Sequence, residues 1–287
     1  LTIIFGVTRI VNFAHGSLHM LGAYVGFTLA EALMATLWAP LGFWAAVLLA
    51  AVAVGAIGGL IEILLLRRIY RAPELFQLLL TFGLVLVFQD VVRLVWGPED
   101  ILGPRAPGLS SFVEILGYRF PQYDLILIAL GPLTLLALWF LFHRTRFGVL
   151  VRAATEDREM VAALGVDQKR LFTTVFVLGA ALAGVSGALQ VPRAALNPQM
   201  DLDVVVQAFV VTVVGGLGSV AGAFLAAILI GLMNAFGILI FPKITLVLVF
   251  LVMAVVLVLR PQGLLGRPEA GGGHGVAVVP LLPVGRR

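Results

Sequence analysis

The sequence contains no cysteine and few charged residues, and both shortages limit what the protein can be. Without cysteine, disulfide bonds and thiolate metal sites are excluded. Only 12% of the 287 residues are charged, whereas 61% are hydrophobic and the mean hydropathy is +1.10. A soluble domain of this length could not bury so much apolar surface, so the solvent around most of the chain must be lipid.

Lysine is also scarce, and its two positions bear on ATP hydrolysis. A phosphate-binding P-loop requires the pattern GxxxxGK[ST]. Lys169 follows Gln168 and Lys243 follows Pro242, so neither lysine fits that pattern. The chain therefore does not hydrolyse ATP by this route. No catalytic dyad or set of metal ligands stands out in the sequence, so we do not expect an enzyme or a metal site.

Long apolar runs predict an all-α fold, a polytopic bundle of transmembrane helices with about eight membrane segments. Crossing roughly 30 Å of hydrocarbon requires about 20 residues. The runs that are long enough, or nearly so, are 18–36, 41–65, 76–96, 124–142, 172–190, 204–218, 220–241 and 244–259. The run 204–218 is short and ends in GGLG, which favours a broken or re-entrant helix. Only LTIIFGV precedes Arg9, so we expect a first helix that is truncated at the N-terminus.

Basic residues in the loops predict the orientation of the spans. A net charge of +4 would suit nucleic acid, but membrane proteins concentrate Lys and Arg in cytoplasmic loops, so we expect no nucleic-acid partner. The loops assigned to the cytoplasm carry Arg67, Arg68, Arg71, Arg144, Arg146, Arg152, Arg158, Lys169, Arg170, Arg260, Arg267, Arg286 and Arg287. The alternate loops carry Arg105, Arg119, Arg193 and Lys243. Loop 97–123 is then external, the membrane domain covers 1–266, and 267–287 is a flexible cytoplasmic tail.

The cytoplasmic loop 143–171 is far longer than a turn between two helices requires. It contains a predicted short helix over 155–165. Thr155 is its expected N-cap, acidic residues follow in the first turn, and Gly165 is its expected terminator. An apolar stripe at helical spacing runs along it. The residues of this predicted helix are Thr155, Glu156, Asp157, Met160, Ala163, Leu164 and Gly165.

A helix of two to three turns is not stable alone in water, so its apolar stripe must dock on something. One alternative is that it packs against the protein's own membrane face or lies in the lipid interface. The other is that it inserts into a groove on a cytoplasmic partner.

The stretch RIVNFAHGSLHMLGAY places many polar groups near the start of the membrane region. Asn12 and His15 lie three residues apart and share a helix face. Gly16 and Ser17 then predict a helix break, with Ser17 capping a new helix that starts at Leu18. Asn12 and His15 either bond the freed backbone or line a translocation path for a solute. His15 has no second or third ligand at useful spacing, so it is not a metal site.

The segment 197–222 has two further features. NPQMDLDV places Asp201 and Asp203 in what we expect to be an exposed external loop. VVGGLGSVAGA follows, and its glycines permit either close helix packing or a broken helix. In a broken helix, backbone groups at Gly215 and Gly216 would contact a passing solute.

Two acidic residues of the spans have basic neighbours within reach. Glu62 lies near the Arg67 end of its span, which indicates an ion pair at the interface. Asp90 and Arg93 lie three residues apart near the external end of theirs, so they can pair on one helix face.

Four segments resemble those of one family and follow one another along the chain in that family's order. RAATEDREMVAALGV is similar to the coupling loop of ABC-importer permeases, and in particular to that of high-affinity branched-chain amino acid permeases. GVTRIVNFAHGSLHMLGAY, VVGGLGSVAGAFLAA and LRPQGLLG resemble signature segments of the same family. The resemblance covers residues 1–266.

The resemblance implies the rest of a transport machine in a bacterial inner membrane. Such permeases work with a sister permease, two cytoplasmic ATPases that hold ATP and Mg, and an external solute-binding protein. The chain itself would carry no cofactor, and the helix over 155–165 would couple it to the ATPases. Alternatives that stay open are an ABC permease for urea or short amides, and a stand-alone secondary transporter or channel.

Overall fold

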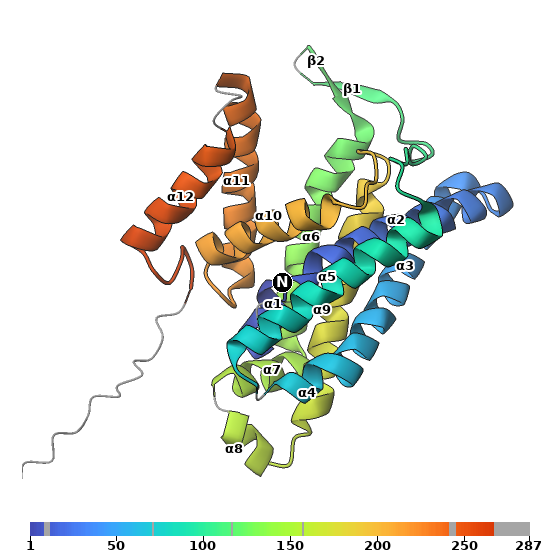
Figure 1. The fold of residues 1–287 in the computed structure, drawn as a ribbon. Coiled ribbons are helices and arrows are strands. Elements are labelled where there is room, and N and C mark those ends of the chain that lie inside the picture. The colour runs from blue at the N-terminus through green and yellow to red at the C-terminus, as the bar shows by residue number, and fades with distance from the viewer. Residues whose placement is uncertain (9–11, 71, 116, 157, 241–244, 267–287) are drawn as a thin grey trace, which may run out of the picture.

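The computed structural model describes residues 1–8, 12–70, 72–115, 117–156, 158–240 and 245–266. The predicted tail over 267–287 lies outside these residues, as does Asp157. The elements are α1 (Thr2–Thr8), α2 (Ala14–Thr36), α3 (Ala39–Ile61), the π-helix η1 (Glu62–Leu66), α4 (Arg67–Ile69), α5 (Glu74–Trp96), β1 (Phe112–Ile115), β2 (Tyr118–Pro121), α6 (Gln122–Arg144), α7 (Arg146–Glu156), α8 (Arg158–Ala163), α9 (Gln168–Gln190), α10 (Met200–Gly215), α11 (Val220–Ile240) and α12 (Thr245–Leu259). The expected all-α helix bundle is confirmed (Figure 1).

Helices α2, α3 and α9 pack together at the centre of the bundle. Small residues allow this close approach. A Cβ atom at Gly187 of α9 would lie 2.0 Å from the carbonyl oxygen of His19 in α2, and one at Gly22 would lie 2.6 Å from the Cα atom of Gly184. Lipid supplies no hydrophobic drive for helix association, so backbone-to-backbone packing is what holds these three helices together.

Six helices of the described residues are long and apolar enough to cross a membrane. They are Ala14–Thr36, Ala39–Ile69, Glu74–Trp96, Gln122–Arg144, Gln168–Gln190 and Val220–Leu239. The expected count of about eight is not confirmed, because the remaining apolar helices are short. α10 has 16 residues and α12 has 15. In Figure 1, α10 runs across the bundle at a steep angle to α11.

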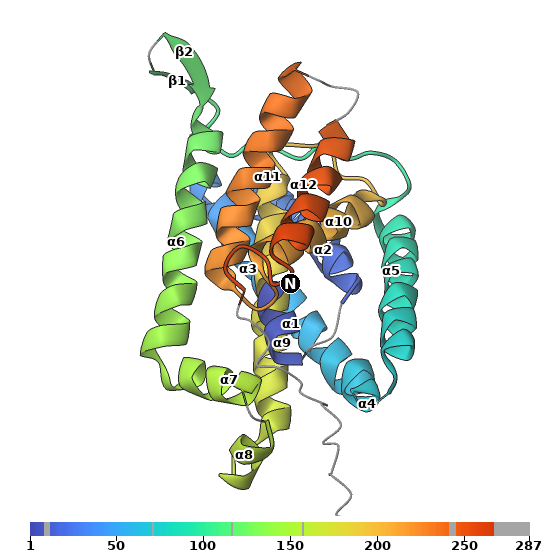
Figure 2. The ribbon, with the colours of Figure 1, turned by 90° about the vertical axis from the view of Figure 1, so that its left-hand side faces the viewer.

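The two ends of the bundle differ in structure. A β-hairpin of β1 and β2 projects from one end, and α8 lies at the opposite end (Figures 1 and 2). The hairpin belongs to loop 97–123 and α8 to loop 143–171, so the two loops lie on opposite sides, in agreement with the orientation that the basic residues predict.

Candidate functional site

The predicted single helix over 155–165 is replaced by two helices, α7 and α8. Thr155 lies in the last turn of α7, and its hydroxyl donates to the carbonyl oxygen of Arg152 at 2.6 Å. The prediction that Thr155 caps a helix start is therefore wrong. The apolar side of α7 explains the difference, because Val151 and Ala154 are buried and continue the helix through Thr155.

The end of α8 has the predicted glycine stop. Gly165 has a φ of +82°, which a glycine adopts without strain. Its N–H donates to the carbonyl of Ala162 at 2.9 Å, and the N–H of Val166 donates to the carbonyl of Val161 at 3.3 Å. This pair of bonds is a Schellman motif. The assignment of Gly165 as the helix terminator is confirmed.

One side of α8 is buried and the predicted apolar stripe is not. Val161 is 4% exposed and packs in a cluster with Phe172 of α9 and Val7 of α1. In contrast, Leu164 is 74% exposed, Met160 is 58% exposed, and Ala163 and Glu156 are exposed. Within the part of the chain that the structure describes, the stripe is therefore not what docks α8 onto the bundle.

A strong cap links α8 to the next span, and the sequence reasoning missed it. The Asp167 side chain accepts hydrogen bonds from the backbone N–H groups of Lys169 at 3.0 Å and Arg170 at 3.3 Å. Asp167 is thus the N-cap of α9. The sequence signal was present, because an aspartate before an apolar run is a common helix start. The cap therefore fixes where α9 starts, directly after the loop that carries α8.

The break in the opening stretch falls earlier than predicted. α2 starts at Ala14, so Gly16 and Ser17 lie inside the helix, and the prediction that Ser17 caps a helix is wrong. Gly16 permits α2 to touch α10, because a Cβ atom there would lie 2.0 Å from the carbonyl oxygen of Asp201. The Ser17 hydroxyl donates to the Asp201 carboxylate at 2.9 Å instead of capping backbone.

Asn12 and His15 are both buried, with different partners. The Asn12 side-chain oxygen accepts from the N–H of Ala14 at 3.1 Å, so it bonds backbone at the start of α2. The His15 Nε2 atom lies 3.1 Å from the backbone nitrogen of Leu1. Asn12 Nδ2 and His15 Nδ1 have no hydrogen-bond partner among the described residues. Their role in a translocation path stays a prediction.

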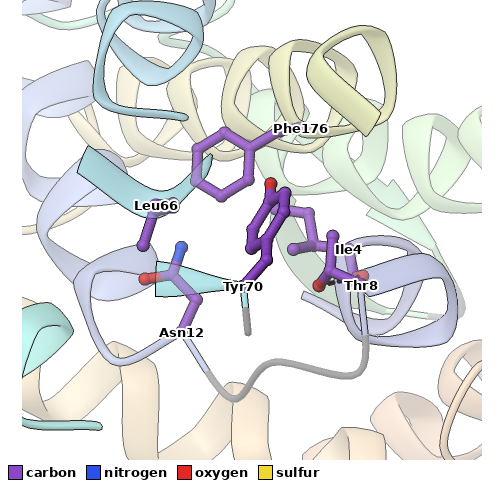
Figure 3. Close-up of a pocket in the computed structure, with 6 residues that line it drawn as sticks. All are labelled: Ile4, Thr8, Asn12, Leu66, Tyr70 and Phe176. Carbon is purple, nitrogen blue, oxygen red and sulfur yellow. Dashed lines mark hydrogen bonds between the residues drawn. The ribbon is translucent and has the colours of Figure 1, made fainter. Parts of the chain in front are cut away.

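Asn12 also lines a narrow crevice, shown in Figure 3. The crevice lies between α1, the start of α2, the end of the Ala39–Ile69 helix and α9, and it is too tight to admit a water molecule. Its lining residues are Ile4, Thr8, Asn12, Leu66, Tyr70 and Phe176. In Figure 3 the rings of Tyr70 and Phe176 lie between Asn12 and Leu66 on one side and Ile4 and Thr8 on the other, so this region is closed in the present conformation.

Gly215 and Gly216 lie at a junction between two of the family-like segments. The carbonyl oxygens of Val214 and Gly215, at the end of α10, accept from the N–H groups of Leu264 and Leu265 at 2.8 and 3.1 Å. Gly216 has a φ of +101°, and a Cβ atom there would lie 2.4 Å from the backbone nitrogen of Gly266. The freed carbonyls of α10 are therefore bonded by the segment after α12. That these glycines line a path stays a prediction.

Asp201 is the main surprise of the structure. The sequence placed it in an exposed loop, which is wrong, because Asp201 is 1% exposed in the first turn of α10. Its carboxylate accepts from Ser17 of α2, from the Gln89 amide of α5 at 2.9 Å, and from the N–H of Leu202 at 2.9 Å. Asp203, in contrast, is exposed as expected.

A second buried carboxylate lies at the other end of the bundle. Glu62 is 0% exposed and pairs with Arg67 at 3.1 Å, which confirms the predicted ion pair. It also accepts from the Tyr70 hydroxyl at 2.9 Å and from the Thr173 hydroxyl of α9 at 2.6 Å. The predicted pair of Asp90 and Arg93 is also present, at 3.4 Å.

Comparison with known proteins identifies the family. The family described as branched-chain amino acid transport system permease component matches residues 1–257. The chain belongs to this family. It is 31% identical over 276 residues to the high-affinity branched-chain amino acid transport system permease protein BraD of Pseudomonas aeruginosa, covering 93% of this chain and 90% of that protein. It is 30% identical to LivH of Escherichia coli K12, covering 93% and 89%.

A second kind of permease from the same transport systems is also similar. LivM of Escherichia coli K12 is 27% identical over 304 residues, which cover 96% of this chain and 69% of that protein. No solved structure matches the chain. This permease chain is thus a multi-pass membrane protein of the branched-chain amino acid transport family.

Proposed function

We propose that the chain is the membrane subunit of an ATP-driven importer of branched-chain amino acids in a bacterial inner membrane. It works with a second permease, two cytoplasmic ATPases that hold ATP and Mg, and an external solute-binding protein. The relatives are named for branched-chain amino acid transport, which supports the substrate class. The likeness to both LivH and LivM supports pairing with a related but different permease.

The exposed apolar stripe of α8 carries the ATP-driven part of the proposal. Leu164 and Ala163 project from the short helix, whereas Val161 anchors it. An apolar stripe beside a rigid anchor is the geometry of a helix that inserts into a groove on a partner. A force on α8 passes to α9 through the packing of Val161 against Phe172, and α9 transmits it to α2 and α3. Alternating access then follows as a tilt of packed helices.

The solute passes between the two permeases in this proposal. The tight crevice at Asn12 and Tyr70 is a cytoplasmic closure of the path, and it opens when α9 moves. His15, Gly215 and Gly216 stay candidates for the path, with the unpaired ring nitrogen of His15 as a polar partner for a zwitterion; backbone groups at the two glycines would contact a solute only if the segment after α12 releases them.

Two other functions would make different demands. A stand-alone transporter or channel would move solute without any ATPase, and α8 would then lie in the lipid interface. An ABC permease for urea or short amides would need the same partners but would accumulate a different solute. Uptake of radiolabelled leucine and urea, with and without the ATPases, separates the three.

The test of coupling uses α8 and a matched control. In L164D a charge replaces the most exposed leucine of the stripe, and in L102D the same change is made at an 81% exposed leucine of the external loop. We expect L164D to lose ATPase co-purification and leucine uptake, while L102D keeps the ATPases bound. G165V forces a branched side chain into a φ of +82° and is expected to abolish transport but not membrane insertion. Normal uptake in L164D and G165V would refute the coupling role.

A further inference from the structure

One face of α10 carries polar side chains that the other described residues of the chain do not cover. Asp203 and Gln207 lie one helical turn apart and are both exposed. Leu202, Val206 and Phe209 are exposed beside them, at 42%, 46% and 36%. No ion pair to Asp203 exists among the residues that the structure describes. The opposite face of α10 is buried against α2 and α11.

The depth of this face follows from the hydrogen bond between Asp201 and Gln89. Gln89 lies seven residues before Trp96, the outer end of α5, which is about 10 Å along the helix axis. Because the Gln89 amide is 2.9 Å from the Asp201 carboxylate, the first turn of α10 lies at the same depth. An apolar cluster that includes Met20, Tyr24, Val92, Val191, Leu196 and Met200 packs next to this turn. Asp203 and Gln207 therefore lie within the span.

Lipid is not a suitable neighbour for this face. A charged side chain inside the bilayer faces the protein interior or a water-filled cavity, because hydrocarbon cannot solvate it. Helix α6 shows what a face suited to lipid looks like in this protein. Its exposed large side chains are Ile128, Leu133, Leu136, Trp139 and Phe140. In Figure 2, α10 lies between α12 and α5, on the other side of the bundle from α6. The two sides thus face different surroundings.

We propose that the α10 face of Asp203 and Gln207 meets the second permease and forms this chain's half of a hydrated path between the two subunits. The inference rests on the proposed function, which supplies the second permease. The mixed character of the face supports this occupant, since Val206 and Phe209 provide apolar contact and Asp203 and Gln207 provide polar contact with water or with a zwitterionic solute. The Asp203 carboxylate has the charge that would attract the ammonium group of an amino acid.

The test uses the absence of cysteine, because any introduced cysteine is then unique in this chain. D203C and Q207C probe the polar part of the face. V206C probes its apolar part without removing a polar group, and L133C on α6 is the lipid-facing control. In assembled complexes in membranes, each variant is treated with a charged, water-soluble methanethiosulfonate and, separately, with a thiol-linked benzophenone for photo-crosslinking to the tagged second permease.

We expect D203C and Q207C to react with the charged reagent about tenfold faster than L133C or more, because hydrocarbon excludes a charged reagent. D203C, Q207C and V206C are expected to crosslink to the second permease, and L133C is not. The inference is overturned if the variants of α10 behave as L133C does, with slow labelling and no crosslink. ATPase co-purification from the same membranes tests the proposed function separately. If the ATPases co-purify but the α10 variants label as slowly as L133C, only this inference is refuted. If the α10 variants label rapidly but no ATPase co-purifies, the proposed function is refuted.

Discussion

Two buried carboxylates, Glu62 and Asp201, are stabilised by different kinds of partner. Both are almost fully buried, at 0% and 1% exposure, and each joins elements that are far apart in the sequence. Glu62 has a cation, Arg67, at 3.1 Å, whereas Asp201 has only neutral donors among the described residues. An unpaired buried charge costs more than a paired one, so the two sites differ in how firmly they hold their helices.

The difference matches the positions of the two sites. Glu62 ties the helix Ala39–Ile69 to α9 through Thr173, near the start of α9 and the loop that carries α8. Asp201 ties α10 to α2 and α5 by single hydrogen bonds. An ion pair suits a part that must transmit force as one body, whereas hydrogen bonds to a carboxylate without a counter-ion suit a contact that must be easier to break. The predictions below test this contrast by comparing the free energy of unfolding in detergent.

The largest effect is expected from E62A. The change removes the acceptor for Arg67, Tyr70 and Thr173 and leaves the guanidinium without its counter-charge. We expect a loss of about 3 kcal/mol in the free energy of unfolding, at the low end for a broken buried pair because the Arg67 side chain is 30% exposed. Titration with SDS, followed by tryptophan fluorescence, measures it. A loss below about 1 kcal/mol would mean that the Glu62 ion pair does not hold the helix Ala39–Ile69 to α9.

Removal of the second carboxylate is expected to cost less. D201A leaves the Ser17 hydroxyl, the Gln89 amide and the Leu202 N–H without an acceptor, which costs about 2 kcal/mol. D201N keeps an oxygen for Gln89 and Leu202 and costs less than about 1 kcal/mol. E62Q is the matched isosteric change, and it should cost more than D201N because Arg67 loses its charge partner. If D201N proves the more damaging of the two, the negative charge of Asp201 is essential and the contrast fails.

Two hydroxyl groups provide a finer comparison. T173V removes the hydroxyl that donates to Glu62 at 2.6 Å and accepts from Arg67 at 2.6 Å, and S17A removes the single bond to Asp201. We expect a loss of about 1.5 kcal/mol for T173V and about 1 kcal/mol for S17A, because bonds to a charged pair are stronger. Equal losses would show that the cation at Glu62 adds nothing to the bond.

The long apolar helices and the glycine stop of α8 were the parts of the structure that the sequence could predict, whereas the caps expected at Thr155 and Ser17 were wrong and the cap at Asp167 was missed. Apolar length and small residues gave the bundle and its close packing, and Gly165 gave the end of α8, because these features depend on neighbours in the sequence. Glu62 and Arg67 could be paired because they lie five residues apart in one helix.

Long-range polar contacts could not be predicted. Asp201 read as a loop residue because its partners, Ser17 and Gln89, lie more than 100 positions away in the sequence. Ser17 read as a cap because serine favours helix starts, but the contact between Gly16 and α10 turned its hydroxyl to a tertiary acceptor. The bonds between the end of α10 and Leu264 were missed for the same reason, because no pattern in either segment indicates contact with the other.

The smallest effect is expected from D90N, which provides the baseline for the contrast. Asp90 pairs with Arg93 at 3.4 Å, with side chains that are 79% and 40% exposed. Arg93 lies within one turn of Trp96 at the end of α5, so the pair reaches the polar interface, where water and salt screen it and side-chain entropy opposes it. We therefore expect a change below about 0.5 kcal/mol. Repeating the titration at high ionic strength should bring D90N and the parent chain together, while the loss in E62A persists because the Glu62 carboxylate is buried. A D90N loss as large as that of T173V would show that exposure does not separate strong carboxylate contacts from weak ones in this protein, and the difference between Glu62 and Asp201 would then need another cause than the presence of a cation.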